Sequence, residues 1–176
     1  DELHIIVFAR KNLGYENINI SNNIFLYPTN HEYKILYLWH IYKIVRPLVA
    51  GHKLSVITAQ DPFESGLAGW LLKIIFRIPL QIQIHADIFS PYFWRESLGN
   101  KIRVLLAKFL LPRADGIRVV SQRIKDSIES NVKGQMSNVI VLPIFVDVKK
   151  IQAAKIKNNL HQKYPDYDFI ILMASR

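Results

Sequence analysis

The stretch SVITAQDPFESGLAGW, residues 55–70, decides the fold of this chain. An apolar run typical of a buried strand stops abruptly at Gln60-Asp61, and a helical pattern begins immediately after it. A strand followed by a sharp turn and a helix is the repeating unit of parallel α/β sheets. The turn poses a functional question, because Gln60-Asp61 either faces a ligand or only caps the helix.

The start of the predicted helix carries several helix-initiating signals. Asp61 stands at the expected N-cap, Pro62 at the first helical position and Glu64 at the third, which predicts a capping-box-like start. Gly66 and Gly69 lie in the first turns of the same helix, where glycine lowers helix stability. They indicate a close approach of either another backbone or a ligand.

The same alternation continues along the chain. Near-continuous apolar strands are typical of a sheet covered on both faces, and intervening helices imply right-handed crossovers. We therefore predict an α/β fold with a doubly wound, Rossmann-like parallel sheet. The predicted strands are 3–9, 24–27, 54–59, 80–85, 116–120, 139–142 and 169–174, and the predicted helices are 32–49, 62–76, 98–111, 121–132 and 148–160.

Composition limits the class of protein. The chain has 176 residues, half of them hydrophobic, which is enough for one folded domain and excludes a disordered chain. It has no cysteine, which removes disulfides and thiolate zinc sites, and no histidine has metal-ligand spacing. Both ends interrupt a strand pattern, so we expect a fragment truncated at both ends. The expected domains are 1–165, which lacks its first strand, and 166–176, the first strand of a second domain.

The chain is basic, with 23 Lys and Arg against 14 Asp and Glu and a net charge of +9. Such a surface favours polyanions, although a solvated basic face is the alternative. A nucleic-acid-binding module is a competing class, but no stacking platform or recognition helix supports it, so no nucleic-acid partner is expected. Two basic regions could rest on anionic lipid. They contain His40, Lys43 and Arg46 in the first predicted helix, and Lys101, Arg103 and Lys108 in another.

The residues that follow the strands are the candidates for a site, because open parallel sheets bind ligands at the carboxyl ends of their strands. His85 ends a strand and has Asp87 two residues on, and a histidine there can donate to a sugar or phosphate oxygen or move a proton. Ser121 follows the next strand, and its alternative role is a helix N-cap. Asp147 is likewise predicted to cap the helix that begins at residue 148.

Several familiar motifs are missing. The sequence contains no Walker A loop, no G-x-G-x-x-G and no G-x-S-x-G elbow.

Five segments in order nevertheless resemble the N-terminal, acceptor-side domain of a GT-B glycosyltransferase of retaining family 4. They are SVITAQDPFESGLAGW (55–70), PLQIQIHADIFSP (79–91), LLPRADGIRVVSQRIKDSI (110–128), VIVLPIFVDVKKI (139–151) and FIILMASR (169–176). The chain departs from the family pattern at Ile144-Phe145, where Asn-Gly is usual, at Ser175, where Gly is usual, and at Ala86.

The resemblance implies a function for the full-length protein. It would be a hexosyltransferase that moves a sugar from a nucleotide diphosphate sugar to a lipid-linked or saccharide acceptor with retention, in the synthesis of cell envelope polysaccharide. It would be cytoplasmic and peripheral to the inner face of the membrane, and this fragment would be inactive alone. By the same resemblance His85 is catalytic, no metal or cofactor is expected, and the substrate-binding residues are Gln60, Asp61, Gly66, Asp87, Ser121 and Arg176. An inverting transferase or a sugar epimerase of GT-B architecture is the alternative enzyme.

Overall fold

The computed structural model describes residues 2–9, 14–30, 33, 36–51, 54–133, 139–154 and 159–171. Contacts divide the chain into two units, Asp1–Pro143 and Ile144–Arg176, and each is described by itself. The predicted boundary at 165/166 concerns domains of a larger protein, and it stays a prediction.

A four-stranded parallel sheet forms the centre of the first unit. Its strands follow the order β4 (Ile57–Ala59), β5 (Leu80–Ile84), β6 (Gly116–Val119) and β7 (Val139–Val141). All four were predicted from their apolar runs, and each is one to three residues shorter than expected. The α/β class and the Rossmann-like parallel sheet are thereby confirmed.

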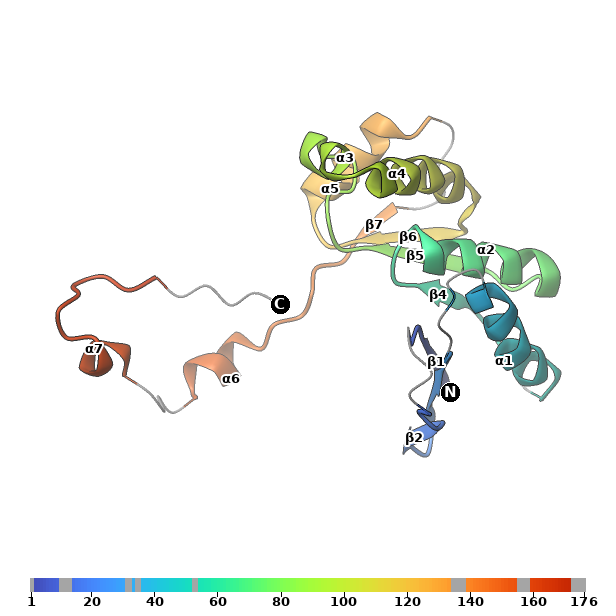
Figure 1. Ribbon diagram of the computed structural model, residues 1–176, viewed down its shortest axis with the longest axis horizontal. Coiled ribbons are helices and arrows are strands. Elements are labelled where there is room, and N and C mark those ends of the chain that lie inside the picture. The colour runs from blue at the N-terminus through green and yellow to red at the C-terminus, as the bar shows by residue number, and fades with distance from the viewer. Residues whose placement is uncertain are drawn as a thin grey trace. The chain divides into compact units, whose positions relative to one another are not determined.

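Helices α2 (Glu64–Phe76), α4 (Leu98–Leu110) and α5 (Gln122–Asn131) pack on this sheet, and Figure 1 shows α4 and α5 over the same face. The shared core is the densest apolar region of the unit. It contains Leu80, Ile82 and Ile84 from β5, Ala107 and Leu110 from α4, and Ile124 and Ile128 from α5. Alternate residues of β5 point into this core, which is the two-residue period that a strand requires.

A second, three-stranded sheet has the order β1-β3-β2. β1 (Leu3–Val7) pairs in parallel with β3 (Ile24–Pro28), and β2 (Ile18–Ser21) pairs antiparallel with β3. Strands β1 and β3 were predicted, and β2 was not. Its alternating pattern, followed by Asn22-Asn23 and then β3, is a hairpin signal that the sequence contained.

Helix α1 (Tyr37–Gly51) connects the two sheets through packing. Its buried residues Ile41 and Val45 pack with Ala68 and Leu72 of α2, and a residue of β1 and one that follows β1, Ile6 and Phe8, also contribute to this cluster. The helix was predicted to begin at residue 32, but Leu36 lies in a tighter turn and the α-helix begins at Tyr37. Residues 31, 32, 34 and 35 lie outside the described residues.

Two further elements differ from the sequence expectation. A short helix α3 (Pro91–Glu96) precedes α4; Ser90 caps it by accepting from Phe93 N–H at 3.3 Å, and Pro91 occupies its first turn. This Ser-Pro start is a helix signal that we missed. Leu111–Arg113 forms a 3₁₀ turn (η2) that ends α4.

The two glycines of α2 allow close packing. A Cβ on Gly66 would lie 2.9 Å from the backbone oxygen of Asp61, and a Cβ on Gly69 would lie 2.7 Å from Cδ1 of Leu80. Both distances are shorter than van der Waals contact. The close approach of another backbone that the sequence predicted is therefore found at Gly66, whereas at Gly69 the neighbour is a side chain.

Asp115 directly precedes β6, and its side chain connects that segment to α2 and to the amino end of β5. Its carboxylate accepts from Leu80 N–H at 2.8 Å and from Lys73 of α2 at 2.7 Å. Lys73 also donates to the Arg113 carbonyl at 2.9 Å. Burial acts to raise the pKa of the Asp115 carboxyl, but the hydrogen bonds from Lys73 and Leu80 and the positive charge of Lys73 outweigh burial and lower the pKa.

We expect Asp115→Asn to lower the free energy of unfolding by about 1 kcal/mol at neutral pH, a modest effect because the side chain is half exposed. A carboxyl whose pKa is lower when folded stabilises the fold above its unfolded pKa of about 3.9, and that contribution is lost as the pH falls through the folded pKa. Urea unfolding at pH 7 and pH 3 measures this, and the difference between wild type and variant should shrink at pH 3.

Asp126→Asn is the control for this prediction, because Asp126 is exposed and bonds Gln122 of its own helix. An equal loss of stability in both variants at pH 7 would contradict the assigned role of Asp115.

The second unit contains two short helices, α6 (Val148–Gln152) and α7 (Leu160–Lys163). Asp147 accepts from Lys150 N–H at 2.9 Å, which confirms the predicted cap. The continuous helix predicted over 148–160 is wrong, because α6 ends at Gln152 in a turn. Its residues are all exposed, so no packing extends it. Residues 169–171 form no strand, contrary to prediction, and 172–176 lie outside the described residues.

Candidate functional site

The carboxyl ends of β4 and β5 bring two of the predicted site residues together. His85 follows β5, Gln60 follows β4, and the His85 Nε2 lies 3.3 Å from the Gln60 Oε1. With Nε2 protonated, the imidazole donates to the amide oxygen. Because both side chains are exposed, they can meet a ligand above this edge of the sheet.

Asp61 stands two residues before the N-cap of α2, which is Phe63 and has no side-chain cap, so the predicted N-cap at Asp61 and first helical position at Pro62 are wrong. The Asp61 side chain instead bonds the turn that precedes the helix. Its carboxylate accepts from Phe63 N–H at 2.8 Å and from Ser65 N–H at 3.3 Å. The Ser65 hydroxyl accepts from Asp61 N–H and donates to the Asp61 carbonyl, both at 3.2 Å. Ser65 thus makes the reciprocal bond that we expected from Glu64.

Glu64 instead serves a contact between helices. Its carboxylate accepts from Arg103 of α4 at 3.0 Å. The predicted capping box is therefore wrong at Glu64, where pairing with a cation 39 residues away replaces a local bond. The helix itself begins at Glu64, two residues later than predicted.

Asp87 lies in the loop after β5 and anchors that loop. Its carboxylate accepts from the Ser127 hydroxyl of α5 at 2.7 Å, and its carbonyl accepts from Ser90 N–H at 3.3 Å. Ser127 was not predicted, and nothing in its sequence position marks it. The bond holds the loop that contains His85 against the neighbouring helix.

Ser121 is the N-cap of α5, which is the alternative role that the sequence predicted for it. Its hydroxyl accepts from Ile124 N–H at 3.4 Å. Gly66 is buried behind Asp61, and Arg176 lies outside the described residues. Substrate contacts of Asp61, Gly66, Asp87, Ser121 and Arg176 stay predictions, as does the catalytic role of His85.

The predicted basic residues occupy two different settings. Lys43, Arg46 and Lys108 are exposed, whereas His40, Lys101 and Arg103 are half-buried. No group of side chains with metal-binding composition occurs among the described residues. Within the same residues, no helix is both long and apolar enough to cross a membrane.

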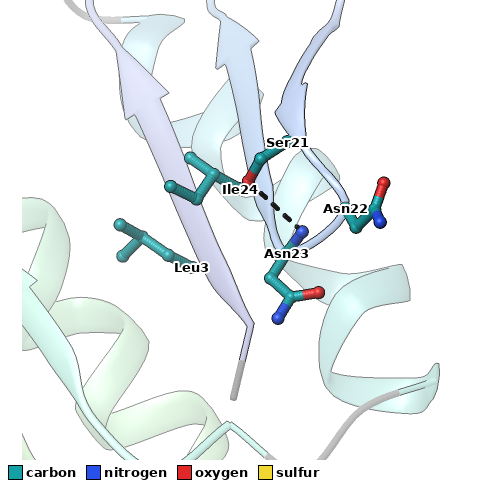
Figure 2. A pocket seen from close by; sticks show the side chains of 5 residues that line it. All are labelled: Leu3, Ser21, Asn22, Asn23 and Ile24. Atoms are coloured by element: carbon teal, nitrogen blue, oxygen red, sulfur yellow. Dashed lines mark hydrogen bonds between the residues drawn. The ribbon is translucent and has the colours of Figure 1, made fainter.

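A separate hollow lies away from these residues. Figure 2 shows it at the turn between β2 and β3, lined by Leu3, Ser21, Asn22, Asn23 and Ile24. This is the amino end of β1 and β3, and the lining offers no titratable side chain. We therefore place the candidate site at the carboxyl ends of β4 and β5 instead.

Solved structures share this architecture. Sucrose-phosphate synthase from Thermosynechococcus elongatus aligns with a TM-score of 0.65 at 18% identity, over 83% of this chain and 39% of that one. A shorter chain of the same enzyme aligns with a TM-score of 0.61 at 15% identity, over 94% and 98% of the two chains. Anabaena HepE in complex with UDP and glucose aligns with a TM-score of 0.47 at 20% identity, over 81% and 36%. The sheet and helices thus define a Rossmann-like half of the GT-B fold.

The family follows from the sequence itself. Residues 1–150 match the family described as Glycosyltransferase Family 4, and the chain belongs to that family. No curated protein matches the chain. The chain spans about two fifths of the sucrose-phosphate synthase chain that it first matches.

Proposed function

We propose that the complete protein is a retaining hexosyltransferase and that this chain is its acceptor-side domain. The donor is a nucleotide diphosphate sugar, and the acceptor is a lipid-linked or saccharide chain of the cell envelope. The observation that carries the proposal is the contact between His85 and Gln60 at the carboxyl ends of adjacent parallel strands, within a chain of glycosyltransferase family 4.

The proposed reaction exchanges one glycosidic bond for another. The bond between the sugar C1 and the diphosphate oxygen breaks, and a bond between C1 and the acceptor oxygen forms on the same face. The acceptor hydroxyl proton passes to the departing phosphate oxygen. His85 orients the reacting groups, and Gln60 fixes the imidazole by accepting from its Nε2–H.

Other residues have supporting roles in this proposal. Asp61, Asp87 and Ser121 border the acceptor side through the segments whose conformation they fix. Arg176 stabilises the negative charge that grows on the diphosphate. The proposal needs no metal, cofactor or nucleic acid, and it places the enzyme in the cytoplasm, peripheral to the membrane.

Thermal unfolding of the complete protein with a panel of nucleotide sugars tests the donor class. A cognate donor at about 100 times its Kd should add roughly 2.7 kcal/mol of stability, because it binds only the folded state. The anomeric configuration of the product, read by NMR, then tests retention. A panel without any stabilising nucleotide sugar would contradict the proposal, and an inverted product would remove its retaining part.

A further inference from the structure

Helix α4 is apolar on two opposite faces. Val104, Ala107 and Leu110 are buried in the core. On the outer side, Leu98, Ile102, Leu105 and Phe109 are 77%, 67%, 60% and 39% exposed. Their spacing of four, three and four residues aligns them in a single stripe. A helix that packs on a sheet ordinarily carries polar residues on that outer face, so this stripe, here called the outer stripe, requires a partner.

The surroundings of the outer stripe are positively charged. No acidic residue occurs over 97–114, whereas Lys101, Lys108 and Arg113 border the stripe. Each of these cations lies over an aromatic ring, with the Arg113 guanidinium 3.8 Å from the centre of the Phe109 ring. In each of these contacts the charged group itself lies beside a ring, and the Arg113 guanidinium also donates to the Phe109 carbonyl. The cations thus stand at the border of the outer stripe, where anions can reach their remaining donors.

Aromatic side chains extend the surface on both neighbouring helices. Trp70 of α2 meets Phe109 edge-on at 5.2 Å between ring centres. On α3, Tyr92 and Trp94 are 87% and 39% exposed. Tyr and Trp combine an apolar ring with a polar tip, which suits the boundary between water and hydrocarbon.

We propose that the outer stripe docks on an anionic membrane, with its apolar side chains inserted at the boundary between headgroups and acyl chains. Apolar insertion bordered by cations is the chemistry that binds a helix in the plane of an anionic bilayer. Arg103 takes no part, because its guanidinium pairs with Glu64 of α2.

The outward face of α1 has a different composition. Its stripe contains Trp39, Lys43 and Arg46, with Lys43 lying 5.3 Å from the centre of the Trp39 ring. This face offers charge and a single large apolar side chain. Insertion is therefore assigned to α4 and not to α1.

The direction of α4 connects the outer stripe to the candidate site. The chain that leaves α4 returns to the amino end of β5, where Asp115 N–H donates to the Leu80 carbonyl at 2.8 Å. The first residue, Leu98, lies about 18 Å away along the helix, toward the strand end that carries His85. The stripe would thus bring a lipid-linked acceptor toward that end. This purpose rests on the proposed function, whereas membrane binding itself does not.

Co-sedimentation of the complete protein with vesicles tests the inference. The vesicles are phosphatidylcholine alone and phosphatidylcholine mixed with phosphatidylglycerol. We expect binding to the mixed vesicles, and we expect the double variant Ile102→Ser, Leu105→Ser to weaken it about tenfold or more at physiological ionic strength. Lys101→Gln with Lys108→Gln should weaken it mainly at low ionic strength.

The matched control is Ile18→Ser with Ile20→Ser on β2, where both isoleucines are also more than half exposed. It should bind vesicles as the wild type does, and thermal unfolding checks that all variants fold. The inference is overturned if the Ile102→Ser, Leu105→Ser variant binds the mixed vesicles as the wild type does, or if the wild type does not bind them. It is also overturned if the wild type is a dimer that does not bind lipid and the same variant is a monomer, because a second copy would then cover the outer stripe. Donor-induced stabilisation, measured without lipid, reports on the proposed function separately.

Discussion

Replacing His85 by alanine is expected to lower kcat/KM of the complete protein by about 100-fold or more, because the variant loses the side chain that we propose to orient the reacting groups. The fold should survive, since the side chain is exposed and its described contact is Gln60. Steady-state transfer to a soluble acceptor, with donor and acceptor varied separately, measures the effect. Gln60→Ala should cause a smaller loss, because the imidazole stays in place but loses its orientation.

The control for this experiment is His161→Ala, a histidine exposed on α7 in the second unit. It should leave kcat/KM unchanged. Wild-type turnover by the His85→Ala enzyme would remove His85 from the mechanism and would favour a different GT-B reaction, such as inversion or epimerisation.

Leu80→Ala is expected to destabilise the first unit by about 2–5 kcal/mol, the usual loss when a buried leucine is truncated. Leu80 begins β5 and is 0% exposed, and its Cδ1 occupies the space above Gly69 of α2. The truncation removes apolar contacts of strand and helix together. Urea unfolding followed by circular dichroism measures the change. The control is Leu98→Ala on the outer stripe of α4, which should change the free energy of unfolding by no more than about 0.5 kcal/mol.

Gly69→Ala tests the same contact from the opposite side. The new methyl group would meet Leu80 Cδ1, and the resulting overpacking should cost about 1–3 kcal/mol, partly offset by better helix propensity. Leu80→Val lacks Cδ1, so the double variant should lose less stability than the sum of the single variants. Gly66→Ala should show no such rescue by Leu110→Val, because its methyl group meets the Asp61 backbone oxygen. Strict additivity at Gly69 and Leu80 would contradict the packing described here.

Local patterns predicted the parts of the fold that are buried. The apolar runs of β5 and β6 and the helical period of α4 face a common core, so their burial and their sequence agree. Prediction failed where packing is weak or the signal is short. β2 is exposed throughout, α3 has six residues, and α6 stops where no neighbour supports it.

The candidate site was predictable in its location and less so in its contacts. The strand-end rule selected Gln60 and His85, and the parallel pairing of β4 and β5 explains why they meet. The bond from Ser127 to Asp87 and the pairing of Arg103 with Glu64 join residues about 40 positions apart. Such pairings depend on how helices pack on the sheet, which no local pattern encodes.

The bond between Asp87 and Ser127 has a practical consequence for exchanging the loop after β5. The loop after β5 is held by α5 through this bond and by its own Ser90 turn. A chimera that receives residues 85–90 from another family member retains Ser127, so a graft without a carboxylate at position 87 would leave that hydroxyl without its acceptor and the loop without its bond to α5. Loop exchange in this scaffold should therefore treat positions 87 and 127 as one transplantable pair.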